Sequence, residues 1–116
     1  MSNQLNPLIR IRAFCLNSPG TTEVLQFGHP FFKVRDKPFA IYSHQSGQKL
    51  SIKVEKQSQP IFLADPRFRK TPYLARHGWI SLALPPSPDW EELEELIEGS
   101  YLFVQSSLKK AKKKQK

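Results

Sequence analysis

The strict alternation of polar and apolar residues in Lys49–Val54 is the feature that most constrains the fold. An extended strand places successive side chains on opposite faces of its sheet. One face of this strand would be apolar, and the other polar with only positive charge: Leu50, Ile52 and Val54 against Lys49, Ser51 and Lys53. Antiparallel sheets allow one face to pack on a core while the other faces water. The alternation therefore predicts a one-sided antiparallel sheet.

Other segments supply the expected neighbours of this strand. Phe31–Val34 and Pro38–Ser43 are typical of a hairpin, and Trp79–Leu84 is typical of a further strand. We interpret Phe27–Pro30 and Asp65–Pro72 as connections, because turn-forming residues and prolines concentrate there.

Three segments have helical patterns. Apolar residues recur three and four positions apart in Leu5–Cys15, which predicts an amphipathic N-terminal helix. A short helix is expected within Glu55–Ala64. Asp89 and Glu92 have the spacing of a capping box, and an apolar stripe continues to Leu108, so a long C-terminal helix is expected. The predicted fold class is α+β, with two layers: an antiparallel sheet and helices packed on one face.

The length of 116 residues is enough for one hydrophobic core but not for two sizeable ones. We expect a single domain over residues 1–108, followed by a lysine-rich tail over residues 109–116. Cys15 is the only cysteine, so no internal disulfide can form and a cytoplasmic location is expected. No stretch approaches the ~20 consecutive apolar residues of a membrane span, so no membrane contact is expected.

The net charge of +8 is distributed in three blocks. Residues 1–88 carry +8, residues 89–108 carry −6, and residues 109–116 carry +6. The body is thus basic without its tail, and the start of the last helix is acidic. A basic surface of this kind favours nucleic acid as a partner.

The residues that most often perform catalysis are scattered along the chain. Cys15 is expected to be buried and inert, and His29, His44 and His77 have neither an identifiable orienting acid nor metal-ligand spacing. The acids of the last helix are interpreted as a solvated face that suits the helix dipole. We therefore expect no enzymatic activity, no catalytic residues, no metal site and no cofactor.

A set of short motifs, in order, is more specific. The motifs are Phe14–Leu16 with Pro19–Glu23, Phe27–Pro30, Lys37–Ala40, Leu50–Val54, Tyr73–Leu74 with Arg76–Leu82, and Trp90–Leu93 with Glu98–Tyr101. In this order they resemble the MmcQ/YjbR-like family over residues 10–108. The lysine-rich tail lies outside the resemblance.

The resemblance implies a compact two-layer fold that is described as double-wing or CyaY-like. Members of the family are commonly described as DNA-binding, a label inferred mainly from their fold, and no catalytic site is established for them. Carried over to this chain, the resemblance makes Lys53, His77 and Trp79 candidate contact residues.

The charges themselves suggest that hairpins, loops and tail would contact phosphates, because lysine and arginine neutralise phosphate and release counterions. The candidates in the body are Lys33, Arg35, Lys37, Lys49, Lys53, Arg67, Arg69, Lys70 and Arg76, and those in the tail are Lys109, Lys110, Lys112 and Lys113. Phe68 and Tyr73 lie among them and would stack on bases if exposed. The acidic last helix is not expected to enter a groove of DNA.

Other interpretations stay open. The basic surface is alternatively only solvated, and the tail is alternatively a solubilising helix end. A protein-interaction module, monomeric or homodimeric, is the second functional hypothesis, because the aromatic residues of the first hairpin exceed what a small core needs: Phe31, Phe32, Phe39 and Tyr42.

Overall fold

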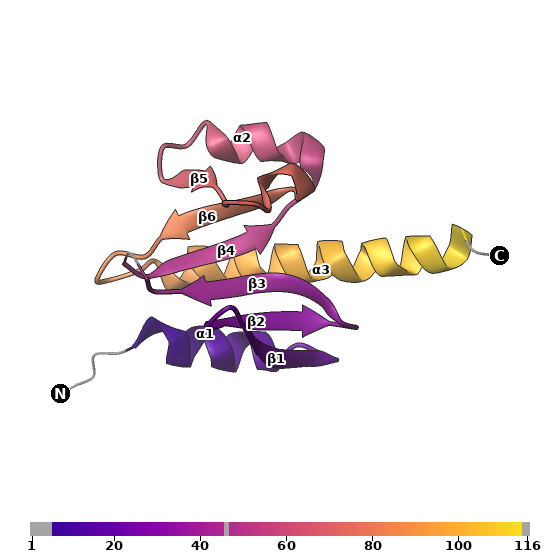
Figure 1. The fold of residues 1–116 in the computed structure, drawn as a ribbon, viewed down its shortest axis with the longest axis horizontal. Coiled ribbons are helices and arrows are strands. Elements are labelled where there is room, and N and C mark those ends of the chain that lie inside the picture. Colours follow the sequence, from indigo (N-terminus) through magenta and orange to yellow (C-terminus); the bar gives the residue numbers. More distant parts are fainter. Residues whose placement is uncertain (1–5, 46, 115–116) are drawn as a thin grey trace.

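The computed structural model describes residues 6–45 and 47–114. Its elements follow the order α1 (Pro7–Leu16), β1 (Thr21–Gln26), β2 (His29–Val34), β3 (Lys37–Ser43), β4 (Lys49–Lys53), η1 (Lys56–Ser58), α2 (Gln59–Leu63), β5 (Phe68–Lys70), η2 (Ala75–His77), β6 (Trp79–Ala83) and α3 (Trp90–Lys114). The long helix α3 runs behind the sheet and projects beyond it at its C-terminal end (Figure 1). The predicted α+β class, with an antiparallel sheet and a long last helix, is confirmed.

The strands form one sheet of six in the order β1-β2-β3-β4-β6-β5, and every neighbouring pair is antiparallel. Tight two-residue turns join the first three strands. In both turns the two central residues have positive φ, as a type I′ hairpin requires: Phe27 and Gly28, then Arg35 and Asp36.

Two of the segments interpreted as connections contain strands, so those interpretations were wrong. Only Phe27 and Gly28 of the first segment form a turn, and His29 and Pro30 already belong to β2. The second segment contains β5, a three-residue edge strand that pairs with β6 alone. A strand this short shows no visible period, and its pairing depends on a partner ten residues further along the chain.

The helices cover one face of the sheet, which we call the covered face. Its core side chains come from every strand except β1: Phe32, Ala40, Leu50, Ile52, Phe68, Ile80 and Leu82. Ile11 and Cys15 of α1 and Leu93, Ile97 and Tyr101 of α3 complete this core. The apolar residues of Lys49–Val54 lie in this core, as their alternation predicted.

Ser100 of α3 joins the two layers. A register shift in the β2–β3 pairing lets Phe39 and Ala40 both join the core, although they are consecutive residues. The side chain of Ser100 fills the resulting gap in the β3–β4 ladder. It accepts a hydrogen bond from the Lys53 backbone N–H at 3.0 Å and donates one to the Phe39 carbonyl at 2.6 Å. The last helix is therefore hydrogen-bonded to the middle of the sheet.

Candidate nucleic-acid interface

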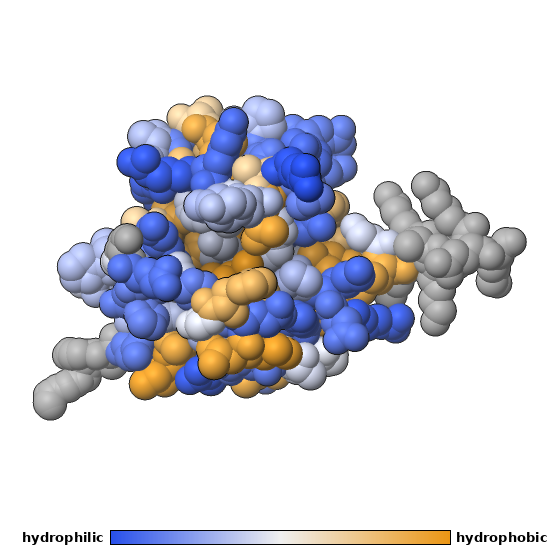
Figure 2. Space-filling view, viewed as in Figure 1, coloured by the Kyte–Doolittle hydropathy of each residue, from blue (hydrophilic) through white to orange (hydrophobic). Residues whose placement is uncertain are grey.

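The face of the sheet opposite α1 and α3, which we call the open face, is crossed by one row of cross-strand neighbours. From β1 to β5 this row is Val24, Phe31, Ile41, Ser51, Ser81 and Arg69. Successive residues of a strand alternate between faces, so the residue two positions from any member of the row shares its face. Figure 2 shows this side of the molecule, where hydrophilic side chains surround smaller apolar areas.

Hydroxyl groups form the centre of the open face. The Ser81 hydroxyl is 2.8 Å from the Ser51 hydroxyl and 2.8 Å from the Thr71 hydroxyl, and all three residues are buried. A hydroxyl can both donate and accept, so Ser81 links the three hydroxyls in a row without a charged partner. Trp79, only 3 % exposed, begins β6 on the same face. The centre of the face is thus a neutral, packed floor.

Four basic side chains surround this floor. Lys33, Lys49 and Lys53 lie two positions from members of the central row, and Arg69 belongs to it. The four salt bridges of the described residues are made by Arg10, Arg12 and Arg67, so none neutralises these four cations. None of the positions that share their face is acidic. The open face therefore carries positive charge without a compensating carboxylate.

Further predicted contacts lie around the edge of this face. Arg35 is exposed at the β2–β3 turn, and Arg76 and His77 are exposed in η2. Lys37 is exposed too, but its register partner Val34 is a core residue, so Lys37 lies on the helix side. Lys70 is also exposed, but its register partner Ile80 is a core residue, so the strand alternation places Lys70 on the helix side.

The two aromatic candidates for base stacking, Phe68 and Tyr73, differ in their exposure to solvent. Phe68 is 7 % exposed and packs edge-on against Phe62 with ring centroids 5.7 Å apart, so it has no free face. Tyr73 is 97 % exposed and has a φ of 66°, an uncommon backbone conformation for an aromatic residue. Tyr73 follows Arg69, Lys70 and Thr71 closely in the chain, so an exposed ring stands beside basic residues.

Arg67 is engaged elsewhere. Its guanidinium donates to both carboxylate oxygens of Glu92 in α3, at 2.9 Å and 2.8 Å, and also bonds Asp65. The bonds to Glu92 and Asp65 raise the pKa of Arg67, and the same contact lowers the pKa of Asp65. Arg67 therefore ties the loop before β5 to the helix layer and does not join the open face. The side chains of Lys109, Lys110, Lys112 and Lys113 lie outside the described residues.

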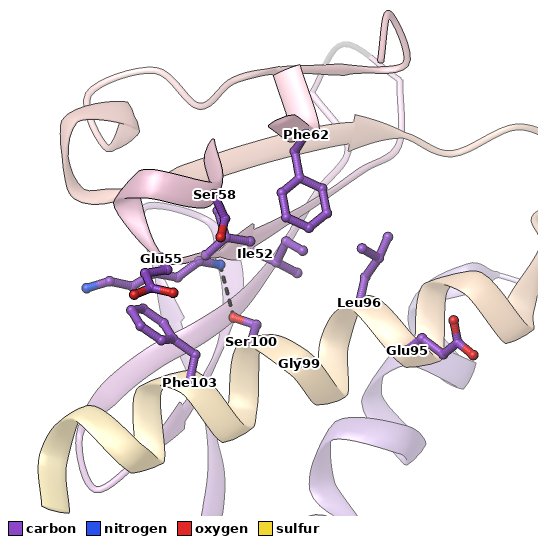
Figure 3. Close-up of a pocket in the computed structure, with 11 residues that line it drawn as sticks. Ile52, Glu55, Ser58, Phe62, Glu95, Leu96, Gly99, Ser100 and Phe103 are labelled. Atoms are coloured by element: carbon purple, nitrogen blue, oxygen red, sulfur yellow. Dashed lines mark hydrogen bonds between the residues drawn. The ribbon is translucent and has the colours of Figure 1, made fainter. Parts of the chain in front are cut away.

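On the helix side, a concave site lies between α3 and the segment from β4 to α2 (Figure 3). It is a groove of about 240 Å³ with apolar walls made by Ile52, Phe62, Leu96 and Phe103. Glu55, Glu95 and Lys53 also line it, so it has two carboxylates and one cation, and Gly99 leaves one wall without a side chain. An apolar groove with carboxylates on its rim is poorly suited to a phosphate, and it contains no pair of a nucleophile with a base.

The other reactive groups stay apart. Burial raises the pKa of the Cys15 thiol to about 12, which keeps it protonated at neutral pH. Within residues 6–45 and 47–114, no three His, Cys, Asp or Glu side chains gather as a metal site would require. No helix in the described part of the chain is both long enough and apolar enough to cross a membrane.

Comparison with known proteins identifies a family. The YjbR family model matches residues 16–103. Among solved structures, the crystal structure of Deinococcus radiodurans protein DR2400, with a DUF419 domain, is similar with a TM-score of 0.74. The two chains are 25 % identical, and the match covers 90 % of this chain and 82 % of that one. A comparison with curated proteins finds no match.

Proposed function

The chain belongs to the YjbR family, and we propose that its open face binds DNA through the phosphates, without catalysis. The observation that carries the proposal is the charge of this face: Lys33, Lys49, Lys53 and Arg69 surround a neutral floor, and no described ion pair neutralises them. Phosphates would replace the counterions that these side chains otherwise attract, which favours binding at low salt.

The roles of the residues follow from their positions. Lys33, Lys49 and Lys53 would act as point charges on successive phosphates, and Arg69 would bind one phosphate with two parallel hydrogen bonds. Arg35 at the β2–β3 turn, with Arg76 and His77 in η2, would extend the contact at the edges. Tyr73 would stack on an unpaired base, because its side chain is 97 % exposed in a loop that also contains basic residues.

The charge of the helix layer also favours DNA on the open face. The exposed residues in the first half of α3 are acidic, and the groove beside them has Glu55 and Glu95 on its rim. Phosphates would be repelled from that side. The proposal therefore assigns DNA to the open face, and contacts by phosphate predict little dependence on base sequence.

A salt series of DNA-binding affinity tests the proposal, measured by fluorescence anisotropy with a labelled duplex and a labelled single strand. Arg69→Ala and Lys70→Ala are matched, since the two residues are consecutive in β5 but lie on opposite faces. Arg69→Ala should weaken duplex binding and reduce the slope of log affinity against log salt by roughly 0.9 for one lost phosphate contact. Lys70→Ala should change neither. No binding at low salt, or equal effects of both variants, would overturn the proposal.

The share of the tail is measured with the same assay. A chain that ends at Leu108 lacks six lysines. If the tail contacts phosphates, its removal flattens the salt slope further than the loss of Arg69 does. An unchanged slope assigns the tail to another role and leaves the open face as the binding surface.

A further inference from the structure

One line of residues along α3 is exposed to solvent. Its members are Glu91, Glu95, Glu98, Leu102 and Ser106, and all five are exposed. They are spaced three or four residues apart, so they lie on one side of a helix with 3.6 residues per turn. We call this line the α3 stripe. Leu102, at its centre, is 51 % exposed, so it offers apolar surface on this side of the helix.

The first half of the α3 stripe is an acidic surface on a basic protein. Two other acids of the helix are engaged, because Glu92 bonds Arg67 and Glu94 bonds Arg10. The three stripe acids make no ion pair among the residues that the structure describes. A partner for this half of the stripe would need positive charge at helical spacing.

The same helix carries that charge further along. Glu98, Glu95 and Glu91 precede Leu102 by four, seven and eleven residues, and Ser106, Lys109 and Lys113 follow it by the same intervals. The pattern is therefore symmetric about Leu102, with the sign of the charge reversed. In an antiparallel pair of α3 helices centred on Leu102, Glu95 lies opposite Lys109 of the second copy, and Glu91 lies opposite Lys113 of the second copy.

The surface around Leu102 leaves room for a second helix. A Cβ atom added to Gly99 would have nothing within 4 Å, so the backbone there can be approached closely. Gly99, Leu102 and Phe103 also line a second hollow beside the helix, together with Glu55, Ser106 and Ser107. Beyond the sheet, α3 continues to Lys114 as a helix (Figure 1), so the helix is long enough to extend along another molecule.

We propose that two copies of this chain associate through antiparallel α3 helices with a twofold axis at Leu102. The occupant is a second copy because the stripe is self-complementary: each acidic half meets the lysine-bearing half of the same sequence. Exposed ion pairs and one leucine from each copy make a small interface, so the dimer is weak and depends on salt. Both open faces remain accessible in this arrangement.

Sedimentation equilibrium of the full chain over a range of concentrations, without nucleic acid, tests the proposal. The average mass should rise toward that of a dimer as concentration increases. Leu102→Arg should lower the association constant by at least roughly tenfold, because it removes the apolar centre. Leu25→Arg is the matched control, since Leu25 is exposed in the edge strand β1 and should leave association unchanged.

A charge-reversal cycle tests the register. Glu95→Lys and Lys109→Glu should each weaken association, and the double variant should restore it, since the reversed pair meets across the twofold axis. All four proteins should keep the same circular dichroism spectrum, which checks that each variant folds as the wild type does. A monomer at every concentration, or a double variant as weak as the singles, overturns the proposal. A dimer that is lost in Leu25→Arg and kept in Leu102→Arg would place the interface at β1 and also overturn it.

Discussion

Consecutive residues of one strand lie on opposite faces of the sheet, and the two faces have different surroundings. On the covered face, Phe32, Leu50 and Ile80 are fully or almost fully buried beneath the helices. Their neighbours Phe31, Ser51 and Ser81 lie on the open face among lysines and hydroxyls. Because of this alternation, we expect that a substitution can change the stability of the fold or the proposed DNA binding separately, at positions one residue apart.

The largest difference in stability between the two faces is expected for Phe31 and Phe32, which are consecutive residues on opposite faces. Phe32→Ala should lower the free energy of unfolding by about 3–5 kcal/mol, because it removes a fully buried ring from the core. Phe31→Ala should cost only about 1 kcal/mol, since that ring is half-buried on the open face. Urea unfolding of both variants measures the difference. Equal losses would show that the open face is covered as tightly as the other.

The second effect concerns the link between the layers. Ser100→Ala leaves the Lys53 N–H and the Phe39 carbonyl without their shared partner, which should cost about 1–3 kcal/mol. The amide of Lys53 should also exchange its hydrogen faster, as NMR would record. Ser106→Ala is the control on the same helix and should stay within about 0.5 kcal/mol of wild type. If Ser100→Ala changes stability as little as Ser106→Ala does, the Lys53 N–H and the Phe39 carbonyl find other hydrogen-bond partners without the serine.

A smaller effect is expected within the hydroxyl chain of the open face. Ser81→Ala removes the shared partner of Ser51 and Thr71 and should cost about 1 kcal/mol in unfolding free energy. Ser51→Ala removes one bond at the end of the chain and should cost less. DNA affinity should change little in either variant, because neither removes a cation. A strong loss of affinity in Ser81→Ala would mean that the hydroxyls themselves contact DNA.

The reactivity of the Cys15 thiol reports whether the covered face is closed, and its raised pKa does not affect stability at neutral pH. Its raised pKa means that the folded state holds the thiol proton more tightly than the unfolded state does. This contribution is complete below the usual thiol pKa of 9.0 and is lost as pH rises toward about 12. A thiol reagent at neutral pH should therefore react only after denaturation. Rapid reaction with the native protein would show that α1 opens readily from the sheet.

The sequence predicted the elements that have strong periodic or capping signals. The alternation in Lys49–Val54 correctly predicted which face of β4 is buried, and Asp89 caps α3 through the Glu92 N–H at 3.2 Å, as the capping pattern indicated. Strands β1 and β5 escaped prediction because an edge strand is specified by its partner more than by its own residues.

The candidate site was predictable only in part. Charge and alternation placed Lys49 and Lys53 on one face, but whether a given cation is free depends on tertiary contacts. Arg67 and Arg69 are indistinguishable in the sequence, yet one is bound to Glu92, 25 residues away, and the other belongs to the open face. The burial of Phe68 likewise follows from packing against Phe62 of α2, which no local pattern records, whereas Tyr73, five residues later, is 97 % exposed.

The hydrogen bond from Ser100 to Phe39 has a consequence for the order in which the chain folds. The two residues are 61 positions apart, so the central strand pair stays incomplete until nearly the whole domain has left the ribosome. Tyr101 makes an even longer connection, because its hydroxyl donates to the Pro19 carbonyl 82 positions away. Contacts of such separation slow folding, since a long loop must close before they form. During synthesis we therefore expect the contacts between α3 and the sheet to form last, after the strands have emerged.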